Sequence, residues 1–146
     1  MRSTMDAPVI EAAVALVVFD GRALVLRRPP RDRRFPNQWC LPGGQLEPGE
    51  SPEDGVRREC LEETRLVIEL TGVAASQVVE VHQHPIRIHP FWARCDTASV
   101  VLSHEHTDHR WLTPEDAARP GTLPSGLAGE VTRGMLDRFA EGGAPA

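Results

Sequence analysis

The sequence predicts an α+β domain in which a mixed β-sheet lies between α-helices. The first observation is the order of the elements, which runs from strands to a helix, back to strands and then to a second helix. The second is a pair of helix-start signals, and the third is the apolar periodicity of each segment. Because each face of a sheet must be covered, this order indicates one helix on each face.

Runs rich in Val, Ile and Leu predict the strands. Val9–Phe19 and Ala23–Leu26 flank Asp20-Gly21, which is a hairpin signal. After the first helix, three strands are expected, with a possible continuation of the last one. Their ranges are Leu66–Val73, Val78–Gln83 and Ile86–Ala98, followed by Val100–Leu102.

The region between the hairpin and the first helix predicts mostly loop. Arg28–Asn37 is rich in Pro and Arg and is expected to form a loop, and Trp39–Leu41 is expected to form a short strand. Pro42-Gly43-Gly44 then predicts a turn, because Pro and Gly interrupt regular structure. The segment from this turn to Gly49 is expected to stay irregular.

The helices are predicted from their first residues. Ser51 can cap a helix that begins at Pro52 and runs to about Thr64. Trp111-Leu112 leads into Thr113-Pro114-Glu115-Asp116, which signals a second, short helix. Ser125–Phe139 is expected to be a helix with one apolar face, formed by Leu127, Val131, Met135 or Leu136, and Phe139.

Length and composition indicate one globular domain. The 146 residues are 40% hydrophobic and 25% charged, so a single domain over 1–146 is expected, with its core at about 9–140. A net charge of −5 argues against binding to duplex nucleic acid or to an anionic membrane. The absence of a signal peptide and of a long apolar run indicates a cytoplasmic protein. Oligomeric state is not readable, although a homodimer is possible.

Two residue types add to this description. All 16 basic residues are arginine, which suits phosphate binding but also follows from coding bias in a GC-rich genome. The three cysteines, Cys40, Cys60 and Cys95, are an odd number without metal-ligand spacing. They therefore indicate a reduced chain.

The first predicted helix carries a cluster of acids. Glu59, Glu62 and Glu63 are spaced so that a helix presents them on one face. A divalent cation would offset their repulsion, and Mg²⁺ prefers oxygen ligands of this kind. Taken alone, the cluster is more typical of a solvated acidic helix face.

A longer motif surrounds these acids. From Gly44 the sequence has five residues, Glu50, seven residues and then Arg58-Glu59-Cys60-Leu61-Glu62-Glu63-Thr64-Arg65-Leu66. This 23-residue segment, 44–66, resembles the Nudix box, Gly-x5-Glu-x7-Arg-Glu-U-x-Glu-Glu-x-Gly-U, in which U is aliphatic. Trp39 to Gly43 also resembles the segment that precedes the box. Two positions depart: Cys60 replaces an aliphatic residue, and Arg65 replaces the glycine that ends the helix.

The resemblance implies the Nudix fold and a metal-dependent hydrolase of diphosphate linkages. It implies that Glu59, Glu62 and Glu63 hold one to three Mg²⁺ ions, or Mn²⁺ in their place, with the Gly44 carbonyl nearby. Arg58 would orient Glu59 or its neighbours through a salt bridge. Metal ions in such a site would neutralise the bridging phosphate oxygens and activate a water for in-line attack.

Outside the box the chain looks like the MutT type, whose members hydrolyse nucleoside triphosphates. That type has an Arg pair at a strand end, matched by Arg27-Arg28, and a glutamate six residues before a Trp, matched by Glu105 and Trp111. Glu105 would then be a metal ligand or the general base, and Arg28 and Arg27 would contact phosphate. Alternatively, the arginines form a solvated strand end and Glu105 is a surface acid.

Histidines and aromatic residues leave further alternatives open. His104, His106, Asp108 and His109 surround Glu105, which suggests a zinc site or, more simply, a histidine that contacts phosphate. His82, His84 and His89 are expected on strands as polar or half-buried residues. Phe35, Phe91 and Trp92 could stack on a base but are more typical of packing.

The sequence therefore predicts hydrolysis of a nucleoside diphosphate-linked substrate. The favoured substrate is a (d)NTP, cleaved to a monophosphate and pyrophosphate. One alternative keeps the fold and changes the substrate to ADP-ribose, a nucleotide sugar or a dinucleoside polyphosphate. A second is a nucleotide-binding module without catalysis, which the intact glutamates oppose.

Overall fold

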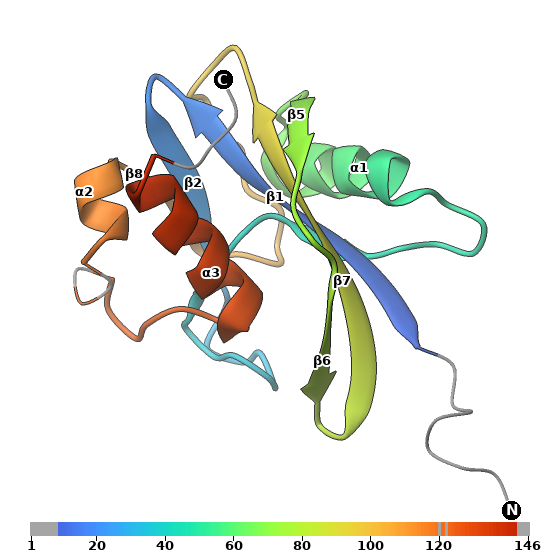
Figure 1. The fold of residues 1–146 in the computed structure, drawn as a ribbon. Helices are drawn as coiled ribbons and strands as arrows, with labels where there is room; N and C mark the ends of the chain where they lie inside the picture. Colours follow the sequence, from blue (N-terminus) through green and yellow to red (C-terminus); the bar gives the residue numbers. More distant parts are fainter. Residues whose placement is uncertain (1–8, 120, 122, 143–146) are drawn as a thin grey trace, which may run out of the picture.

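The computed structural model describes residues 9–119, 121 and 123–142. Within these residues one sheet contains eight strands, and helices cover both of its faces (Figure 1). The strands are β1 (Ile10–Phe19), β2 (Arg22–Arg27), β3 (Trp39–Cys40), β4 (Gly43–Gln45), β5 (Glu69–Val73), β6 (Gln77–Val81), β7 (His84–Arg94) and β8 (Asp108–Leu112). The helices are α1 (Pro52–Thr64), α2 (Pro114–Ala117) and α3 (Gly129–Ala140). The predicted α+β class with a mixed sheet between helices is confirmed.

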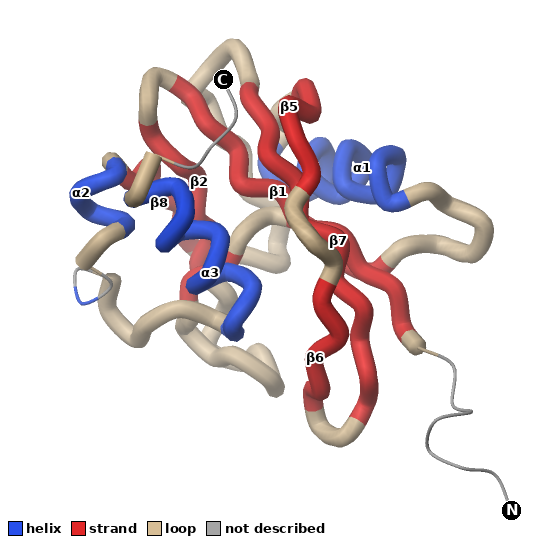
Figure 2. Tube along the Cα trace, in the orientation of Figure 1, coloured by secondary structure: helices blue, strands red, loops and turns tan. Residues whose placement is uncertain are grey.

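The sheet is mixed because its central pair is parallel. β1 runs parallel to β7 over Ile10–Val18 and Ile86–Arg94, while all other pairings are antiparallel. The path β3-β2-β1-β7-β5 forms the body of the sheet, with β4 added to β1, β6 to β7 and β8 to β2. Figure 2 shows β6 and the first half of β7 as a hairpin that projects beyond the helices.

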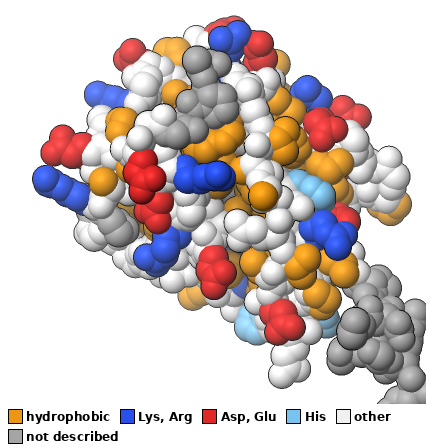
Figure 3. Space-filling model, viewed as in Figure 1, with side chains coloured by type: hydrophobic (Ala, Val, Ile, Leu, Met, Phe, Trp, Pro, Cys, Tyr) orange, Lys and Arg blue, Asp and Glu red, His pale blue; other side chains and the backbone are white. Residues whose placement is uncertain are grey.

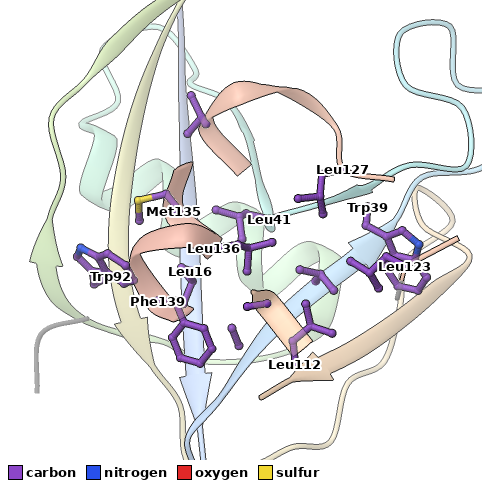
Figure 4. Close-up of a cluster of buried hydrophobic side chains, with 14 residues drawn as sticks. Leu16, Trp39, Leu41, Trp92, Leu112, Leu123, Leu127, Met135, Leu136 and Phe139 are labelled. Carbon is purple, nitrogen blue, oxygen red and sulfur yellow. The ribbon is translucent and has the colours of Figure 1, made fainter. Parts of the chain in front are cut away.

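Alternation along β1 divides the core into two clusters. Leu16 packs with Trp92, Met135, Leu136 and Phe139 under α3 (Figure 4), because its side chain faces that side of the sheet. The neighbouring Ala15 and Val17 face α1 and pack with Val56, Cys60 and Phe91. The apolar face predicted for the last helix is therefore buried in α3, through Val131, Met135, Leu136 and Phe139.

Two predicted boundaries are wrong because of backbone conformation. The helix expected from Ser125 begins only at Gly129, since Ser125, Gly126 and Gly129 have φ angles of 71°, 76° and 85°. The strand expected to end at Gln83 ends at Val81, and His82 and Gln83 form the hairpin turn with φ angles of 50° and 67°. Left-handed backbone just before α3 and just after β6 thus interrupts the regular helix and strand geometry.

Four further segments differ from the structure that the sequence predicts for them. β7 ends at Arg94 rather than at Ala98, and residues 100–102 form no strand. The segment expected to stay irregular after Pro42 contains β4, which pairs with β1. β8 forms over Asp108–Leu112, where the sequence predicts no strand, because the whole segment pairs with β2.

The predicted end of α1 at Thr64 is confirmed, and Arg65 adopts the conformation that the family glycine would have. Its φ and ψ are 64° and 14°, and its N–H donates to the Leu61 carbonyl at 3.0 Å. A non-glycine residue in this conformation is strained by roughly 1–2 kcal/mol. The helix therefore ends, as many helices do, at a residue with left-handed backbone conformation, and this residue is the strained Arg65.

Surface and helix properties agree with the composition. Acidic and basic side chains are interspersed on the face shown in Figure 3, as a small net charge predicts. In the described part of the chain, no helix is both long and apolar enough to cross a membrane. The three cysteines are free thiols, and Cys40 and Cys60 are buried.

Candidate active site

β4 brings two glycines against the first strand and the first helix. Gly43 pairs with Val14 and has a φ of 149°, and a Cβ atom there would collide with the Ala13 carbonyl oxygen. A Cβ atom on Gly44 would lie 2.7 Å from Cδ of Glu59. Glycine is therefore required at Gly43, where backbone atoms approach too closely for any side chain, and a side chain at Gly44 would force the Glu59 carboxylate to move.

Glu63 is a buried acid that is held by the same segment. Its side chain is 3% exposed, and the Gly43 N–H donates a 2.8 Å hydrogen bond to its Oε1. The pKa of Glu63 is raised to about 9, mainly by burial and also by the Glu59 and Glu105 carboxylates, against the lowering effect of the Gly43 hydrogen bond. Without a counterion, this carboxyl is thus unfavourable in its charged form.

Glu59 lies beside Glu63 in the same environment. Burial raises the pKa of Glu59, Arg58 opposes this, and Glu62 and Glu105 add to the increase. The influence of Glu105 on both acids means that it lies near them, although 42 residues separate it from Glu63. The structure therefore gathers three acids from two distant segments.

The segment after β7 explains how Glu105 reaches the helix. Val101 N–H donates to the Thr64 carbonyl at 3.1 Å, and Ser103 N–H donates to the Glu63 carbonyl at 3.2 Å. These bonds use carbonyl groups that the end of α1 leaves without intrahelical partners. The residues predicted as a strand at Val100–Leu102 instead bind the helix end and deliver Glu105 next to the acids.

Arg58 connects the acids to the start of the helix. Its Nε and Nη2 donate to the two carboxylate oxygens of Glu50 at 2.8 and 2.9 Å, and its Nη1 donates to Glu59 at 3.1 Å. The Arg58 hydrogen bonds lower the pKa of Glu50 to about 2, and those with Glu50 raise the pKa of Arg58. The fork geometry fixes Arg58, whose Nη1 contacts the Glu59 carboxylate.

Glu62 lies at the edge of this cluster. Its side chain is 58% exposed and its carboxylate is 3.5 Å from Nη1 of Arg58. It does not line the cavity that Glu59, Glu63 and Glu105 line. The structure thus separates one predicted acid from the other three.

The predicted arginine pair divides between two environments. Arg27 donates to the Asn37 carbonyl at 3.0 Å and lies over the Trp39 ring, away from the cavity lining. Arg28 lines the cavity, but its Nε and Nη2 bind Asp32 at 2.9 and 2.8 Å. Arg27 therefore supports the fold locally, and the charge of Arg28 is balanced by Asp32.

A buried pair lies behind Arg28. His106 Nε2 is 3.7 Å from Cys40 Sγ, and Nδ1 of His106 has no hydrogen-bond partner within the described residues. Burial raises the pKa of the Cys40 thiol to about 12, and burial together with Arg28 lowers the pKa of His106 to about 4. Both groups are neutral near pH 7, so His106 packs the base of the Glu105 loop without charge.

The other aromatic and histidine residues fall into simpler places. Phe91 and Trp92 are buried in the core, whereas Phe35 lines the cavity. His89 binds Glu11 at 2.9 Å. Over residues 9–119, 121 and 123–142, no three His, Cys, Asp or Glu side chains are already grouped closely enough to hold a metal ion, so the zinc alternative near His106 gains no support.

One cavity of about 950 Å³ unites the acids with the rest of the site. Its wall contains the β6–β7 hairpin, the β2–β3 loop and the start of α3. The acidic part is formed by Gly43, Gly44, Glu59, Glu63 and Glu105, and the apolar part includes Ile10, Val14, Val79, Ile88 and Phe35. Such a volume and mixture are typical of a nucleotide-sized ligand site.

Comparison with known proteins decides the family. The model of the NUDIX domain matches residues 9–132, which include every strand and the acidic helix. The chain belongs to the NUDIX family. It is thus a hydrolase of phosphoric anhydride bonds, and members of this family generally use divalent metal ions.

Individual NUDIX relatives are similar over most of their length. The CTP pyrophosphohydrolase of Escherichia coli (strain K12) is 30% identical over 118 residues, which cover 81% of this chain and 86% of that protein. The MutT-like protein of Streptomyces ambofaciens is 38% identical over 116 residues, covering 76% and 69%. The crystal structure of the MutT protein from Methanosarcina mazei Go1 has a TM-score of 0.77 and 30% identity, and the match covers 94% of this chain and 96% of that one. The predicted resemblance to MutT-like NUDIX hydrolases is confirmed.

Sequence reasoning did not single out several residues of this NUDIX site. Asp32, Arg31 and Arg34 belong to the loop predicted at Arg28–Asn37, where only the abundance of arginine was a signal. Asp32 is two residues before Arg34 and three before Phe35, and it accepts hydrogen bonds from both backbone N–H groups. An aspartate followed by a turn is a recognisable sequence signal for such a loop. No sequence signal identifies Arg28 as the partner of this aspartate.

Proposed function

We propose that the protein is a Mg²⁺-dependent pyrophosphohydrolase that converts a (d)NTP into a nucleoside monophosphate and pyrophosphate. The observation that carries the proposal is the meeting of Glu59, Glu63 and Glu105 in one cavity beside Gly44. Glu63 is buried, Glu59 is partly buried and Glu105 is exposed. Burial raises the pKa values of Glu59 and Glu63, and repulsion from the neighbouring carboxylates adds to the increase. A site with surplus negative charge and only oxygen donors suits a hard divalent cation.

In this proposal Glu59 and Glu63 hold the metal together with Glu105, Glu62 and the Gly44 carbonyl. Since these side chains are not yet grouped as ligands of one ion in the described residues, binding draws Glu105 and Glu62 toward the buried pair. When bound, Mg²⁺ neutralises phosphate oxygens and makes a water more acidic, and Mn²⁺ can replace it.

The protein's own residues supply position and proton transfer. Arg58 holds Glu59 in place through its two bonds to Glu50. Glu105 accepts the proton of the attacking water, because it lines the cavity on a loop that is anchored at both Glu63 and Arg27. The water oxygen then bonds to phosphorus as the bond to the bridging oxygen breaks, and that oxygen leaves with the other product.

The substrate class is supported by the cavity and by one relative. The apolar wall formed by Val14, Val79 and Ile88, with Phe35 at the loop, can accept a nucleoside next to the acids. The Escherichia coli relative that shares 30% of its residues over 118 positions acts, by its name, on CTP. We propose the same class of substrate, a nucleoside triphosphate, for this chain, without assigning the nucleobase.

A substrate screen tests the proposal. Purified protein with Mg²⁺ or Mn²⁺ is given the common NTPs and dNTPs, ADP-ribose, a nucleotide sugar and a dinucleoside polyphosphate, and ³¹P NMR identifies the products. We expect the highest kcat/KM for a triphosphate, with pyrophosphate as product. A preference for ADP-ribose or a dinucleotide, or ligand recovered intact, would replace the proposal with one of the alternatives.

Variants of two glutamates connect the activity to the site. Glu105→Gln should reduce kcat by about tenfold or more, as loss of a metal ligand or its support implies. Glu115→Gln is the control, because Glu115 lies on α2 and is exposed, 3.5 Å from Arg119. Equal activity of wild type and Glu105→Gln would contradict the role of Glu105.

A further inference from the structure

The loop between β2 and β3 is a rigid structure organised by one aspartate. Asp32 accepts hydrogen bonds from Arg28 Nε at 2.9 Å and from the backbone N–H groups of Arg34 and Phe35 at 2.9 and 2.8 Å. The Asp32 N–H itself donates to the Pro29 carbonyl at 3.1 Å. Four hydrogen bonds at one residue hold the loop in a defined shape.

This loop spans the cavity between two other elements. At one end Arg31 Nη2 donates to the His104 carbonyl at 3.4 Å, which joins the loop to the segment that carries Glu105. At the other end the Phe35 ring lies next to Gly129 at the start of α3, 3.9 Å from where a Cβ atom on that glycine would be. The loop side chains are therefore positioned relative to the acids.

Three arginines of this loop, Arg31, Arg33 and Arg34, differ in where they lie. Arg31 and Arg34 line the cavity, whereas the neighbouring Arg33 does not. All three are exposed to solvent. The loop thus presents two of its guanidinium groups to the cavity and turns the third away.

The charges of Arg31 and Arg34 are not balanced by the protein. The carboxylate of Asp32 is bound to Arg28, and within the described residues neither Arg31 nor Arg34 forms an ion pair. Arginine binds phosphate oxygens through two parallel N–H groups. Arg31 and Arg34 line the same cavity as the acids. They provide the positive charge that a polyphosphate needs at its end away from the acids.

We propose that Arg31 and Arg34 form a second phosphate subsite, which holds the terminal phosphate of the substrate and selects triphosphates over diphosphates. The inference rests on the proposed function, since it assigns the phosphate end of that substrate. Asp32 is a positioning residue in this arrangement, because it touches the loop backbone and Arg28.

The test compares matched arginine variants on two substrates. The Arg31→Ala/Arg34→Ala double variant should lower kcat/KM for the preferred NTP by about tenfold or more, which is the effect of losing charge-assisted hydrogen bonds. The same variant should change kcat/KM for the corresponding NDP by less than about threefold. Arg33→Ala is the control and should leave both values within about twofold, because its charge lies on the same loop outside the cavity.

Three outcomes would overturn the subsite. These are equal losses for NTP and NDP, no loss for either, or an Arg33→Ala variant as defective as the double variant. Arg31→Lys, which keeps the charge, should recover part of the NTP preference. A thermal melt of each variant separates these effects from loss of folding.

A binding measurement keeps the subsite testable without catalysis. Inorganic tripolyphosphate and orthophosphate are titrated into the wild type and the variants with Mg²⁺ present. We expect tripolyphosphate binding that the double variant weakens by about tenfold and Arg33→Ala does not. If no NTP is cleaved but this pattern holds, the proposed function fails and the subsite stands. If NTPs are cleaved but the double variant binds tripolyphosphate as tightly as the wild type, the subsite is wrong and the proposed function stands.

Discussion

The backbone N–H of Gly43 donates a 2.8 Å hydrogen bond to Oε1 of Glu63, which joins β4 to the helix that carries the acids. The bond orients a carboxylate that is only 3% exposed. Because Gly43 pairs with Val14 of the central strand, the hydrogen bond fixes the Glu63 carboxylate relative to the middle of the sheet. Glu63 is therefore held in place by the same strand pairing that forms the core.

Gly44→Ala tests the close packing of the acids against β4. The added Cβ would lie 2.7 Å from Cδ of Glu59, so the carboxylate must move. We expect kcat to fall by about tenfold or more, since small displacements of reacting groups are costly. Gly134→Ala in α3 is the control, because no atom lies within 4 Å of its added Cβ. Full activity of Gly44→Ala would contradict the packing argument.

The sequence was sufficient for the parts of the site that depend on local spacing. The helix over Pro52–Thr64, its cap at Ser51 and its buried Val56 and Cys60 follow from periodicity and first-turn chemistry. The family pattern also placed Glu105 with these acids, which periodicity could not do. That contact depends on hydrogen bonds from residues 101 and 103 to the end of α1, and no local signal encodes them.

Other features were beyond the sequence because distant segments decide them. β4 looked irregular because Gly43 and Gly44 suggest a turn, but pairing with β1 makes the segment a strand. Arg27 and Arg28 looked equivalent, yet Trp39 and Asn37 hold one while Asp32 holds the other. Neighbours in sequence separate here because side chains on a strand alternate between its two faces.

Arg58→Lys tests the bracing of Glu59. Lysine keeps the charge but cannot form the two parallel bonds to Glu50, which measure 2.8 and 2.9 Å. We expect kcat to fall by about tenfold with little change in KM, because the acids lose orientation while the cavity keeps its shape. Arg57→Lys is the control, since Arg57 is exposed and meets only Asp54 at 3.5 Å. Equal kinetics for both variants would contradict the role of Arg58.

Arg65→Gly tests the strain at the end of α1. The φ angle of 64° is costly for arginine and free for glycine, but glycine also makes the unfolded chain more flexible. The two effects leave an expected gain of up to about 1 kcal/mol in the free energy of unfolding, measured by urea denaturation. Turnover should not change. A loss of stability would show that the Arg65 side chain makes a compensating contact.

Asp32→Asn tests the charge that organises the β2–β3 loop. Burial raises the pKa of Asp32, but hydrogen bonds from Arg28, Phe35 and Arg34 outweigh it and lower that pKa to about 2. A folded pKa below the unfolded value of about 3.8 stabilises the protein above that pH, and this stabilisation is lost as pH falls toward 2.

Denaturation at several pH values measures this contribution. The wild type should be more stable than Asp32→Asn between about pH 5 and 7, and the difference should shrink toward zero near pH 2. Asp54→Asn is the control, because the Asp54 side chain is 75% exposed and its ion pair with Arg57 is 3.5 Å long. A stability difference that does not change with pH would contradict the assigned ion pair.

The most direct test of the metal-dependent site is a comparison of the wild type and Glu63→Gln. Burial and the neighbouring carboxylates make a charged Glu63 unfavourable without metal, so the variant should be at least as stable as the metal-free wild type. Mn²⁺ binding is measured by electron paramagnetic resonance, and pyrophosphate release from the preferred NTP is measured in the same samples. We predict that Glu63→Gln weakens Mn²⁺ binding and slows turnover, each by about tenfold or more. Wild-type Mn²⁺ affinity together with undiminished turnover in Glu63→Gln would contradict the account.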